Sequence, residues 1–259
     1  MRLKLSSIMI EARNLIAKIA TNNDEIEACK RLRHRIFLRG LNEGIGDSEQ
    51  GVKLDEDIYD SLAEHIILID RKRLCKGLNN YAVGTCRLIV GGASDGPNHF
   101  YSNSEFVIDS LVKSRNLFLE VGRSCVDHEY RDGLALYLLW LALIKYLENK
   151  EVEIVFGVAS FKGNSPHEFN HALSFLHYNH ISKTITVPAR PEGFLKLNQM
   201  AEEHINVQQA KKQLPSLLKT YLSFGGQIGE GAFIDRQLKT IDIFVFAEKS
   251  NIINKYKIS

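Results

Sequence analysis

Residues 116–135 read NLFLEVGRSCVDHEYRDGLA, and the interpretation of the whole chain starts from them. An apolar run carries an acid, Glu120, and a base, Arg123, and then passes through a polar turn containing Gly133 into a long apolar segment. Burying a carboxylate and a guanidinium is costly unless the two are paired or used. Amides at a helix N-terminus lack an internal partner and favour a phosphate. The stretch therefore predicts a strand, a phosphate-binding turn and a helix in succession.

The spacing of Glu120 and Arg123 limits how they can cooperate. On an ideal strand, residues three apart point to opposite faces of the sheet. They share one site only if the strand bends or bulges, which Gly122 between them allows. In that arrangement Glu120 takes a proton from an attacking amine, directly or through a water, and Arg123 orients it or binds an acid group. The alternative is two unrelated ion pairs at the edge of the sheet.

Hydrophobic patterning predicts an alternation of strands and helices. The segment 133–149 is apolar on nearly every side until Lys145, which indicates a buried helix. Strands are expected over 63–70, 81–90, 117–126, 152–160, 181–187 and 240–247. Helices are expected over 24–38, 105–113, 167–179, 196–212 and 214–224. This interleaving predicts an α/β protein with a mixed (α+β) sheet and helices on both faces, forming a single domain over 1–259 with a polar helical excursion near 196–212.

The composition is that of an ordinary globular protein, with 44% hydrophobic and 25% charged residues and a net charge of +2. No strong overall attraction to nucleic acid follows from this charge. The four cysteines lack the spacing of a metal site and fit a reducing compartment. No run reaches the ~20 apolar residues of a membrane span. Charged residues within 1–20 argue against a secretory signal and favour an amphipathic helix, packed on its own domain or resting on a membrane surface.

Charged clusters offer further candidate sites. Asp55, Asp57 and Asp60 precede the expected strand at His65. They suit the cationic end of an amino-acid substrate, a metal held through oxygens, or a solvated loop with a helix cap. Their spacing lacks the glycine and the terminal glutamate of a calcium loop, and we expect no metal site. Two basic clusters form either solvated surface or a docking patch for an acidic partner: Arg31, Arg33, Arg35 and Arg39, and Arg71, Lys72 and Arg73.

Eight segments follow one another in an order that resembles a known family. They are RHRIF (33–37), DEDIYDSLAEHIILID (55–70), VGTCRLI (83–89), FYSNSEF (100–106), LEVGRSCVDHEYRDG (119–133), LLWLALIKYL (138–147), FGVASF (156–161) and LLKTYLSFGGQIGEGAFIDRQLKTIDIFVF (217–246). Together they resemble the bacterial ornithine–acyl-[acyl carrier protein] N-acyltransferases, often labelled hemolysin-like. That family belongs with the GNAT-type N-acetyltransferase fold, which has three layers and a splayed central sheet. The segments are also similar to acyl-homoserine-lactone synthases.

The resemblance implies that a 3-hydroxyacyl chain is transferred from an acyl carrier protein to the α-amine of ornithine, giving a lyso-ornithine lipid. It places Glu120 and Arg123 at the acid–base position of the strand. The positions on the substrate side are Arg33, Phe37, Asp57, Asp60, His65 and Arg87. The acyl-donor positions are Val126, Arg131, Gly133, Leu134 and Ala135.

The donor loop departs from the pattern of the fold. That pattern usually reads Arg/Gln-x-x-Gly-x-Gly/Ala, whereas Arg131 and Gly133 are one residue closer. The shortening favours the phosphopantetheine thioester of an acyl carrier protein over acyl-CoA as donor substrate, with no cofactor bound. The expected partners are the carrier protein and a small amino acid, in the cytoplasm with peripheral contact at the inner membrane surface. The alternatives are a signal synthase that acylates S-adenosylmethionine and a non-catalytic module that binds acyl chains or carrier protein.

Overall fold

The computed structural model describes residues 8–37, 53–77, 79–115 and 117–258. Its chain divides into two compact units. Unit 1 comprises Met1–Ile89 and Val121–Glu151, and unit 2 comprises Val90–Glu120 and Val152–Ser259. The strands β4 (Ala82–Gly92) and β5 (Leu117–Val126) contribute residues to both units. The expectation of one domain over 1–259 stays a prediction.

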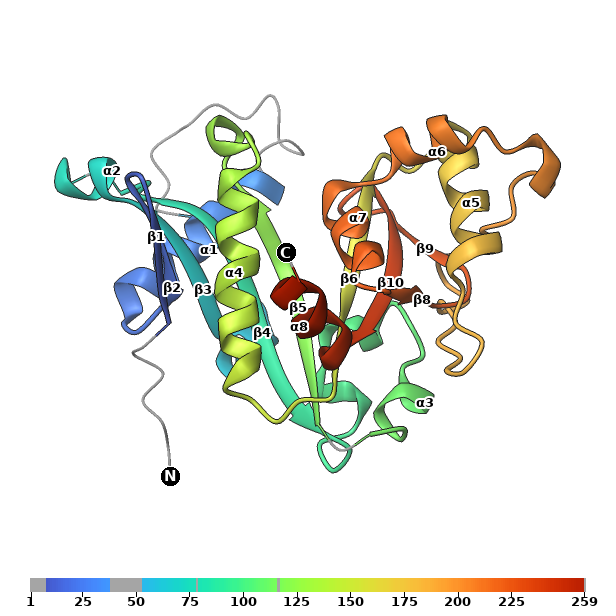
Figure 1. Cartoon of the computed structure of the whole chain (residues 1–259), viewed down its shortest axis with the longest axis horizontal. Helices are drawn as coiled ribbons and strands as arrows, with labels where there is room; N and C mark the ends of the chain where they lie inside the picture. The colour runs from blue at the N-terminus through green and yellow to red at the C-terminus, as the bar shows by residue number, and fades with distance from the viewer. Residues whose placement is uncertain (1–7, 38–52, 78, 116, 259) are drawn as a thin grey trace. The chain divides into compact units, whose positions relative to one another are not determined.

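Unit 1 is built on antiparallel strands covered by two long helices (Figure 1). Besides its parts of β4 and β5, its elements are β1 (Met9–Ala12), β2 (Leu15–Ile19), α1 (Asn23–Phe37), the 3₁₀ helix η3 (Ile58–Leu62), β3 (Glu64–Asp70), α2 (Arg71–Cys75), η6 (His128–Tyr130) and α4 (Leu134–Glu148). Strand β3 lies between β2 and β4 and is antiparallel to both.

The alternation of side chains along β3 determines which helix each residue meets. Ile67 and Ile69 pack with Ala28 and Cys29 of α1. Leu68 points the other way: a Cβ placed on Gly84 would meet both Leu68 and Leu139 of α4 at 3.2 Å. Helices α1 and α4 therefore cover opposite faces of β3. Residue 65 has the same parity as Ile67, and this places it on the side of α1.

The start of the chain differs from the expectation. The helix expected within 1–20 is a hairpin of β1 and β2, in which Met9 pairs with Lys18 and Ala12 with Leu15. Leu15, Ala17 and Ile19 are buried while the residues between them are not, which is the period of a strand. Arg13 takes a left-handed backbone conformation at the turn (φ 55°). The prediction was wrong because charged residues at every few positions imitate a helical stripe in such a short hairpin.

Unit 2 is centred on β10 (Thr240–Glu248), which pairs antiparallel with β6 (Ile154–Lys162) over its whole length. It also pairs with β9 (Ala232–Asp235) and β8 (Gln227–Ile228), and β9 pairs with β7 (Phe194–Leu195). The helices of unit 2 are η4 (Pro97–His99), η5 (Tyr101–Ser104), α3 (Asp109–Val112), η7 (Pro166–Phe169), α5 (Asn170–His180), η8 (Glu202–His204), α6 (Val207–Gln213), α7 (Ser216–Ser223) and α8 (Lys249–Ile258). The range 196–212 thus holds η8 and most of α6.

Aromatic rings fill the core of unit 2 beside the first part of β5. Phe156 of β6 lies 5.1 Å from Phe100 and 5.6 Å from Phe244, measured between ring centroids. The start of β5 runs parallel to β6, and their register extends from Phe118 opposite Ile154 to Glu120 opposite Phe156. Glu120 therefore lies in register with the aromatic layer of β6. Together the two units make a mixed α/β protein, as the alternation of segments predicts.

One expected strand of unit 2 is missing. Within 181–187 the structure has an isolated bridge between Ile181 and Ile228 but no strand. The Ser182 hydroxyl accepts the backbone amides of Thr184 at 3.3 Å and Ile185 at 3.1 Å. Such a side-chain turn competes with strand pairing. Threonine and isoleucine in this stretch suggested a strand, but the serine turn decides its conformation.

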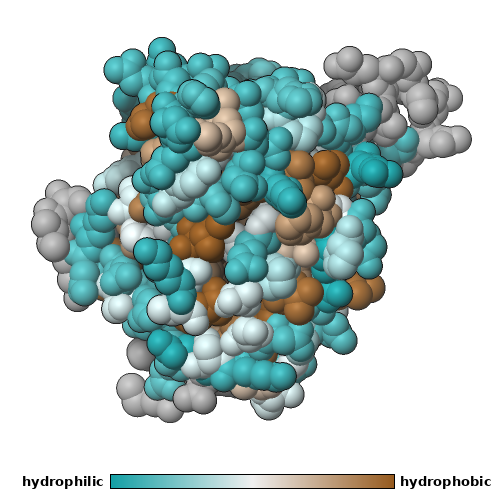
Figure 2. Space-filling model, turned by 90° about the vertical axis from the view of Figure 1, so that its right-hand side faces the viewer, coloured by the Kyte–Doolittle hydropathy of each residue, from teal (hydrophilic) through white to brown (hydrophobic). Residues whose placement is uncertain are grey.

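In the part of the chain that the structure describes, few large apolar side chains are exposed. Figure 2 shows that hydrophobic residues on the viewed face form small groups among hydrophilic ones. Large exposed hydrophobics of unit 2 include Tyr178, Phe194 and Val207. Scattered apolar residues of this kind are ordinary on a protein surface. Among the described residues, no helix combines the length and the apolar character needed to cross a bilayer.

Candidate active site

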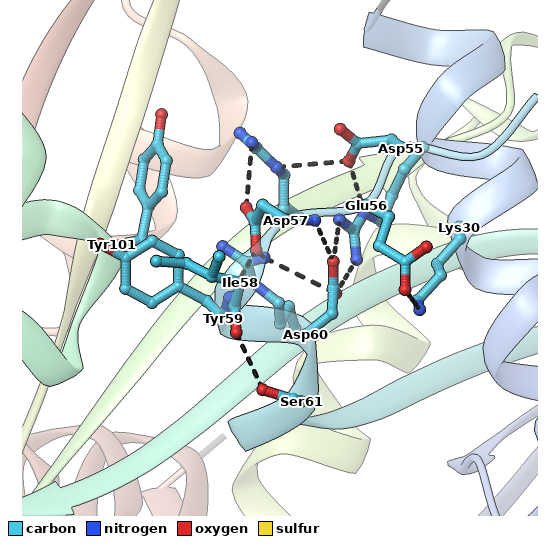
Figure 3. A network of polar contacts seen from close by, with 12 residues as sticks. Lys30, Asp55, Glu56, Asp57, Ile58, Tyr59, Asp60, Ser61 and Tyr101 are labelled. Atoms are coloured by element: carbon cyan, nitrogen blue, oxygen red, sulfur yellow. Dashed lines mark hydrogen bonds and ion pairs between the residues drawn. The ribbon is translucent and has the colours of Figure 1, made fainter.

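A buried ion network in unit 1 joins α1, η3 and β3 (Figure 3). Arg33 of α1 is fully buried; its Nε donates to Asp55 Oδ2 at 2.6 Å and its Nη1 to Asp60 Oδ1 at 2.5 Å. Nη2 donates to Asp60 Oδ2 at 3.0 Å, which makes the pairing bidentate. His65 Nε2 lies 3.2 Å from Asp60 Oδ1. Three of the predicted substrate-side residues are thus brought together, with Asp55 added to them.

The acids are presented by η3 because two of them cap its backbone. Asp57 Oδ1 accepts the amide of Tyr59 at 2.9 Å, and Asp60 Oδ2 accepts the amide of Asp57 at 2.9 Å. This reciprocal capping box favours short acids at these two positions. A helix cap was one of the alternatives for the acidic cluster. The structure contains the cap but not the solvated loop, because Asp60 is buried.

Asp57 extends the network to two more arginines. Arg87 of β4 is buried, donates from Nη1 to Asp57 Oδ1 at 2.6 Å, and lies over the Tyr59 ring at 5.7 Å. Arg123 Nη2 lies 3.4 Å from Asp57 Oδ2, and its Nε lies 3.3 Å from Asp55 Oδ2. The side chains of Asp55, Asp57 and Arg123 keep 12%, 23% and 17% of their exposure. The network therefore has a buried base and a partly exposed rim made of these three residues.

Opposite charges keep the base of the network ionised. Burial disfavours the charge of Arg33, but its hydrogen bonds and ion pairs with Asp60 and Asp55 outweigh burial and raise its pKa. Burial acts to raise the pKa of Asp60, but hydrogen bonds to His65, Arg33 and the Asp57 amide outweigh it and hold this pKa well below its usual range. Both side chains remain charged at neutral pH.

The backbone of β5 is distorted where the charge spacing requires it. Arg123 has a left-handed φ of 48° inside the strand, a conformation that costs a side-chain-bearing residue energy. The expected distortion at Gly122 is thus found at the next residue. A Cβ on Gly122 would meet nothing within 4 Å, so no close approach requires glycine there. The distortion accompanies the pairing of Arg123 with Asp55 and Asp57.

Glu120 has a different environment, in unit 2. It is 2% exposed. Its Oε2 accepts the amide of Tyr101 at 2.9 Å, and its Oε1 accepts the amide of Ser102 at 2.7 Å and the Ser102 hydroxyl at 2.5 Å. All three donors belong to η5, so two backbone amides and one hydroxyl hold the carboxylate. Cooperation between Glu120 and Arg123 stays a prediction.

The predicted donor turn begins where β5 ends and leads into α4. The carbonyl of Val126 accepts a bond from Arg131 Nε at 3.2 Å. Gly133 has φ 97° with nothing within 4 Å of an added Cβ, so the backbone angle itself favours glycine. The amide of Leu134 donates to Asp132 Oδ1 at 3.1 Å, and Ala135 is buried. The strand–turn–helix order is confirmed, and phosphate binding stays a prediction.

The sequence did not indicate the residues that bind Glu120, and one predicted substrate-side residue is not connected to the ion network. Phe37 is the partly buried last residue of α1, and no described contact ties it to the network. Tyr101 and Ser102, the donors to Glu120, were not singled out. No spacing rule links Ser102 to an acid 18 positions away. The signal available was the FYSNSEF segment, whose small polar residues suit a tight turn.

Carboxylates close enough to share a metal ion occur elsewhere in unit 2. Within the described residues, Glu105, Asp235 and Asp242 place one oxygen each within 4.8 Å of the others. Their oxygens already accept other bonds: Tyr101 Oη donates to Glu105, and Thr240 Oγ1 donates to Asp242. None of the predicted site residues belongs to this group.

The class of protein follows from the fold and from a family model. Residues 32–141 match the acetyltransferase (GNAT) domain. This range contains the ion network, Glu120 and the turn before α4. With the mixed α/β fold, it defines a GNAT-type acyltransferase. Among solved structures, the AHL synthase LasI covers 94% of this chain and 96% of its own, at 12% identity and a TM-score of 0.47.

Two sequence relatives narrow the class. The L-ornithine N(α)-acyltransferase of Rhodobacter capsulatus is 32% identical over 240 residues, which are 93% of this chain and 92% of that protein. The enzyme of the same name from Rhizobium meliloti is 32% identical over 254 residues, 97% of this chain and 86% of that protein. The chain belongs to the L-ornithine N(α)-acyltransferase family, and it is an enzyme that transfers acyl groups.

Proposed function

We propose that the chain moves a (3-hydroxy)acyl group from an acyl carrier protein to the α-amine of ornithine, giving a lyso-ornithine lipid. The observation that carries this proposal is the match to relatives named for ornithine acylation over most of their length. In the reaction the amine nitrogen forms a C–N bond with the thioester carbonyl carbon and the C–S bond breaks. The leaving thiolate takes up the proton that the amine loses.

The rim of the ion network is our candidate for recognising the amino acid. Asp55 and Asp57 offer carboxylates to the ammonium groups of ornithine, and Arg123 offers a guanidinium to its carboxylate. These three side chains keep partial exposure, whereas Arg33, Asp60, His65 and Arg87 are buried. We assign the buried four to holding the rim in place rather than to contacting the substrate.

Glu120 is our candidate for accepting the proton from the amine. An ammonium has no lone pair, so the nucleophile needs a base. Because the side chain of Glu120 is 2% exposed, the proton reaches it through a water. The bonds from η5 orient the carboxylate for this role. This assignment rests on the position of Glu120 in the strand, as the family resemblance implies.

We place the acyl donor on the turn formed by Val126, Arg131, Gly133, Leu134 and Ala135. Asp132 already caps the amide of Leu134, so an acid lies at the N-terminus of α4. This acid opposes a highly charged pyrophosphate and agrees with a carrier-protein donor rather than acyl-CoA. Donor and carrier are both part of the proposal.

An acidic carrier protein would dock on exposed basic residues. Arg31 is paired with Glu27, and Arg73 with Asp127 and Glu129. Arg71 pairs with Glu11 but keeps 46% of its side-chain exposure, and Lys72 beside it is exposed. We place docking there, where charge complementarity speeds encounter. Arg39 lies outside the described residues. The lipid product suggests a cytoplasmic enzyme in peripheral contact with the inner membrane surface.

The test is incubation with 3-hydroxyacyl carrier protein and ornithine, followed by mass spectrometry of the product. The expected product is N-acylated ornithine, and S-adenosylmethionine offered as acceptor in parallel should give none. Activity on another amine without product from ornithine would overturn the ornithine assignment. The substitution Asp57→Asn should raise the KM for ornithine, because it removes a charge from the rim.

A further inference from the structure

The turn after β5 is held by side chains from three other elements of unit 1. Asp127, the first residue of the turn, is 5% exposed, and its amide donates to the Val83 carbonyl at 2.9 Å. Its Oδ2 pairs with Arg73 of α2 and Arg35 of α1, each at 3.3 Å. A buried acid with two cations on one oxygen fixes the start of the turn.

Arg73 contacts both ends of η6. Nη1 reaches Asp127 Oδ2 at 3.3 Å and the Asn80 carbonyl at 3.1 Å, while Nη2 pairs with Glu129. The same guanidinium lies over the Tyr130 ring at 5.0 Å. A planar guanidinium can make these contacts at once, and a lysine ammonium cannot.

A hydrogen bond between Tyr130 and Asp70 secures the C-terminal end of η6. The Tyr130 hydroxyl donates to Asp70 Oδ2 at 2.5 Å, and Asp70 Oδ1 accepts Asn14 Nδ2 at 2.6 Å and the Lys72 amide at 2.8 Å. Burial and the bond to Asp70 raise the pKa of Tyr130 to about 12, so the phenol remains a donor at neutral pH. Asp70 is also the N-cap of α2, which carries Arg73. One carboxylate therefore ties α2 and η6 together.

We infer that Arg73, Asp127, Asp70 and Tyr130 form a turn clamp whose task is to position the acyl-donor turn for the thioester. Arg73 and Tyr130 are then positioning residues, which act on the donor through the backbone of 131–135. The inference rests on the proposed function, in which this turn receives the donor.

Steady-state kinetics with donor and ornithine varied separately tests the turn clamp. Arg73→Ala should lower kcat/KM for the acyl carrier protein donor by about 10²-fold, because a misplaced donor loses the reacting geometry. The KM for ornithine at saturating donor should stay at its wild-type value. Arg73→Lys should recover part of the lost kcat/KM, since lysine keeps a positive charge beside Asp127 but lacks the planar set of donors of a guanidinium. The matched control is Arg115→Ala, which removes an exposed arginine paired with Glu153 and Glu248 in unit 2.

Tyr130→Phe separates positioning from carrier docking and from misfolding. It removes one hydroxyl and no charge, so it leaves attraction to an acidic carrier unchanged. The KM for the donor should rise about threefold to tenfold, the effect of one hydrogen bond. A wild-type donor KM in both Tyr130→Phe and Arg73→Ala would overturn the inference. Equal rises in the KM for donor and for ornithine, with a lowered thermal midpoint, would also overturn it, because they indicate general loosening.

The variant Gly133→Ala distinguishes a failure of the turn-clamp inference from a failure of the proposed function. Alanine is strained at the positive φ of this position, so the substitution should displace the turn while leaving the residues of the turn clamp unchanged. If Gly133→Ala leaves the donor KM unchanged, the turn does not receive the donor, and both the donor assignment and the clamp inference fall. If it raises the donor KM while Arg73→Ala and Tyr130→Phe do not, the turn receives the donor and the clamp inference alone is wrong.

Discussion

The ion network around Arg33 and the surroundings of Glu120 both bury charge, but by different means. In the network, acids and guanidinium groups neutralise one another over short distances. Glu120 receives two backbone amides and a hydroxyl, which are neutral donors. Removing a member of the network leaves an unbalanced buried charge, whereas replacing Glu120 leaves these neutral donors to satisfy. We therefore expect the network to govern stability and Glu120 to govern turnover.

The largest effect should come from Glu120→Gln. Turnover should fall by about 10²–10⁴-fold if Glu120 accepts the proton from the amine. The glutamine amide also points a donor at one of the η5 amides, so the thermal midpoint must be measured beside the rate. Near-normal turnover in a folded variant would remove Glu120 from the mechanism. It would also contradict the expectation that Glu120, unlike the ion network, governs turnover.

Asp60→Asn tests the network side. Breaking a buried pair should lower the free energy of unfolding by about 3–5 kcal/mol, because Arg33 keeps its charge without its bidentate partner. Denaturant unfolding measures this change. The control is Glu56→Gln in the same segment, whose carboxylate is 57% exposed and pairs with Lys30; it should cost about 0–1 kcal/mol. Similar losses in the two variants would contradict the division between buried base and exposed surface.

Acid titration sharpens the same contrast. The pKa of Asp60 is lower in the folded than in the unfolded chain. Its contribution to stability is therefore fully present above the unfolded pKa and is lost progressively as pH falls below it. Wild-type stability should decline from about pH 5 downward as the unfolded chain takes up protons. Denaturant midpoints across this range should decline less steeply in Asp60→Asn, and an unchanged slope would show that Asp60 does not carry this dependence.

Apart from the Glu56→Gln control, the smallest effect should come from Ser102→Ala. It deletes the hydroxyl that donates to Glu120 and leaves both backbone amides in place. The loss of unfolding free energy should be about 1.5–3 kcal/mol, the range for a hydrogen bond to a charged group. Thermal unfolding checks this value. A loss as large as that of Asp60→Asn would mean that the two regions bury charge in equivalent ways.

Much of the central fold was predictable because its signals are local. Alternating or continuous apolar runs gave β3, β4, β5, β6 and β10, and the glycine and apolar run gave the turn and α4. The N-terminal hairpin and the 181–187 loop were not predictable in the same way. Their conformations depend on a left-handed residue at Arg13 and a side-chain turn at Ser182, which hydrophobic patterning does not report.

The candidate site was predictable in its residue types but not in its grouping. Arg33, Asp57, Asp60 and Arg87 were named together, and the structure joins them through long-range pairs. Strand parity allowed Glu120 and Arg123 to share a site only if the strand is distorted; a left-handed residue occurs at Arg123 rather than at Gly122, and their cooperation stays a prediction. The donors to Glu120 were missed, because the FYSNSEF segment indicates a tight turn but not the acid that its amides bind.

The division of the chain has a consequence for how the protein can be cut. The polypeptide passes between the two units three times, at the joins 89–90, 120–121 and 151–152. Two of these joins lie inside β4 and β5. A truncation or a proteolytic nick there interrupts a strand, and neither unit corresponds to one continuous piece of the gene. No single cut at these joins separates the two units: a fragment ending at residue 89 or 120 lacks residues 121–151 of unit 1, and a fragment ending at residue 151 still carries residues 90–120 of unit 2.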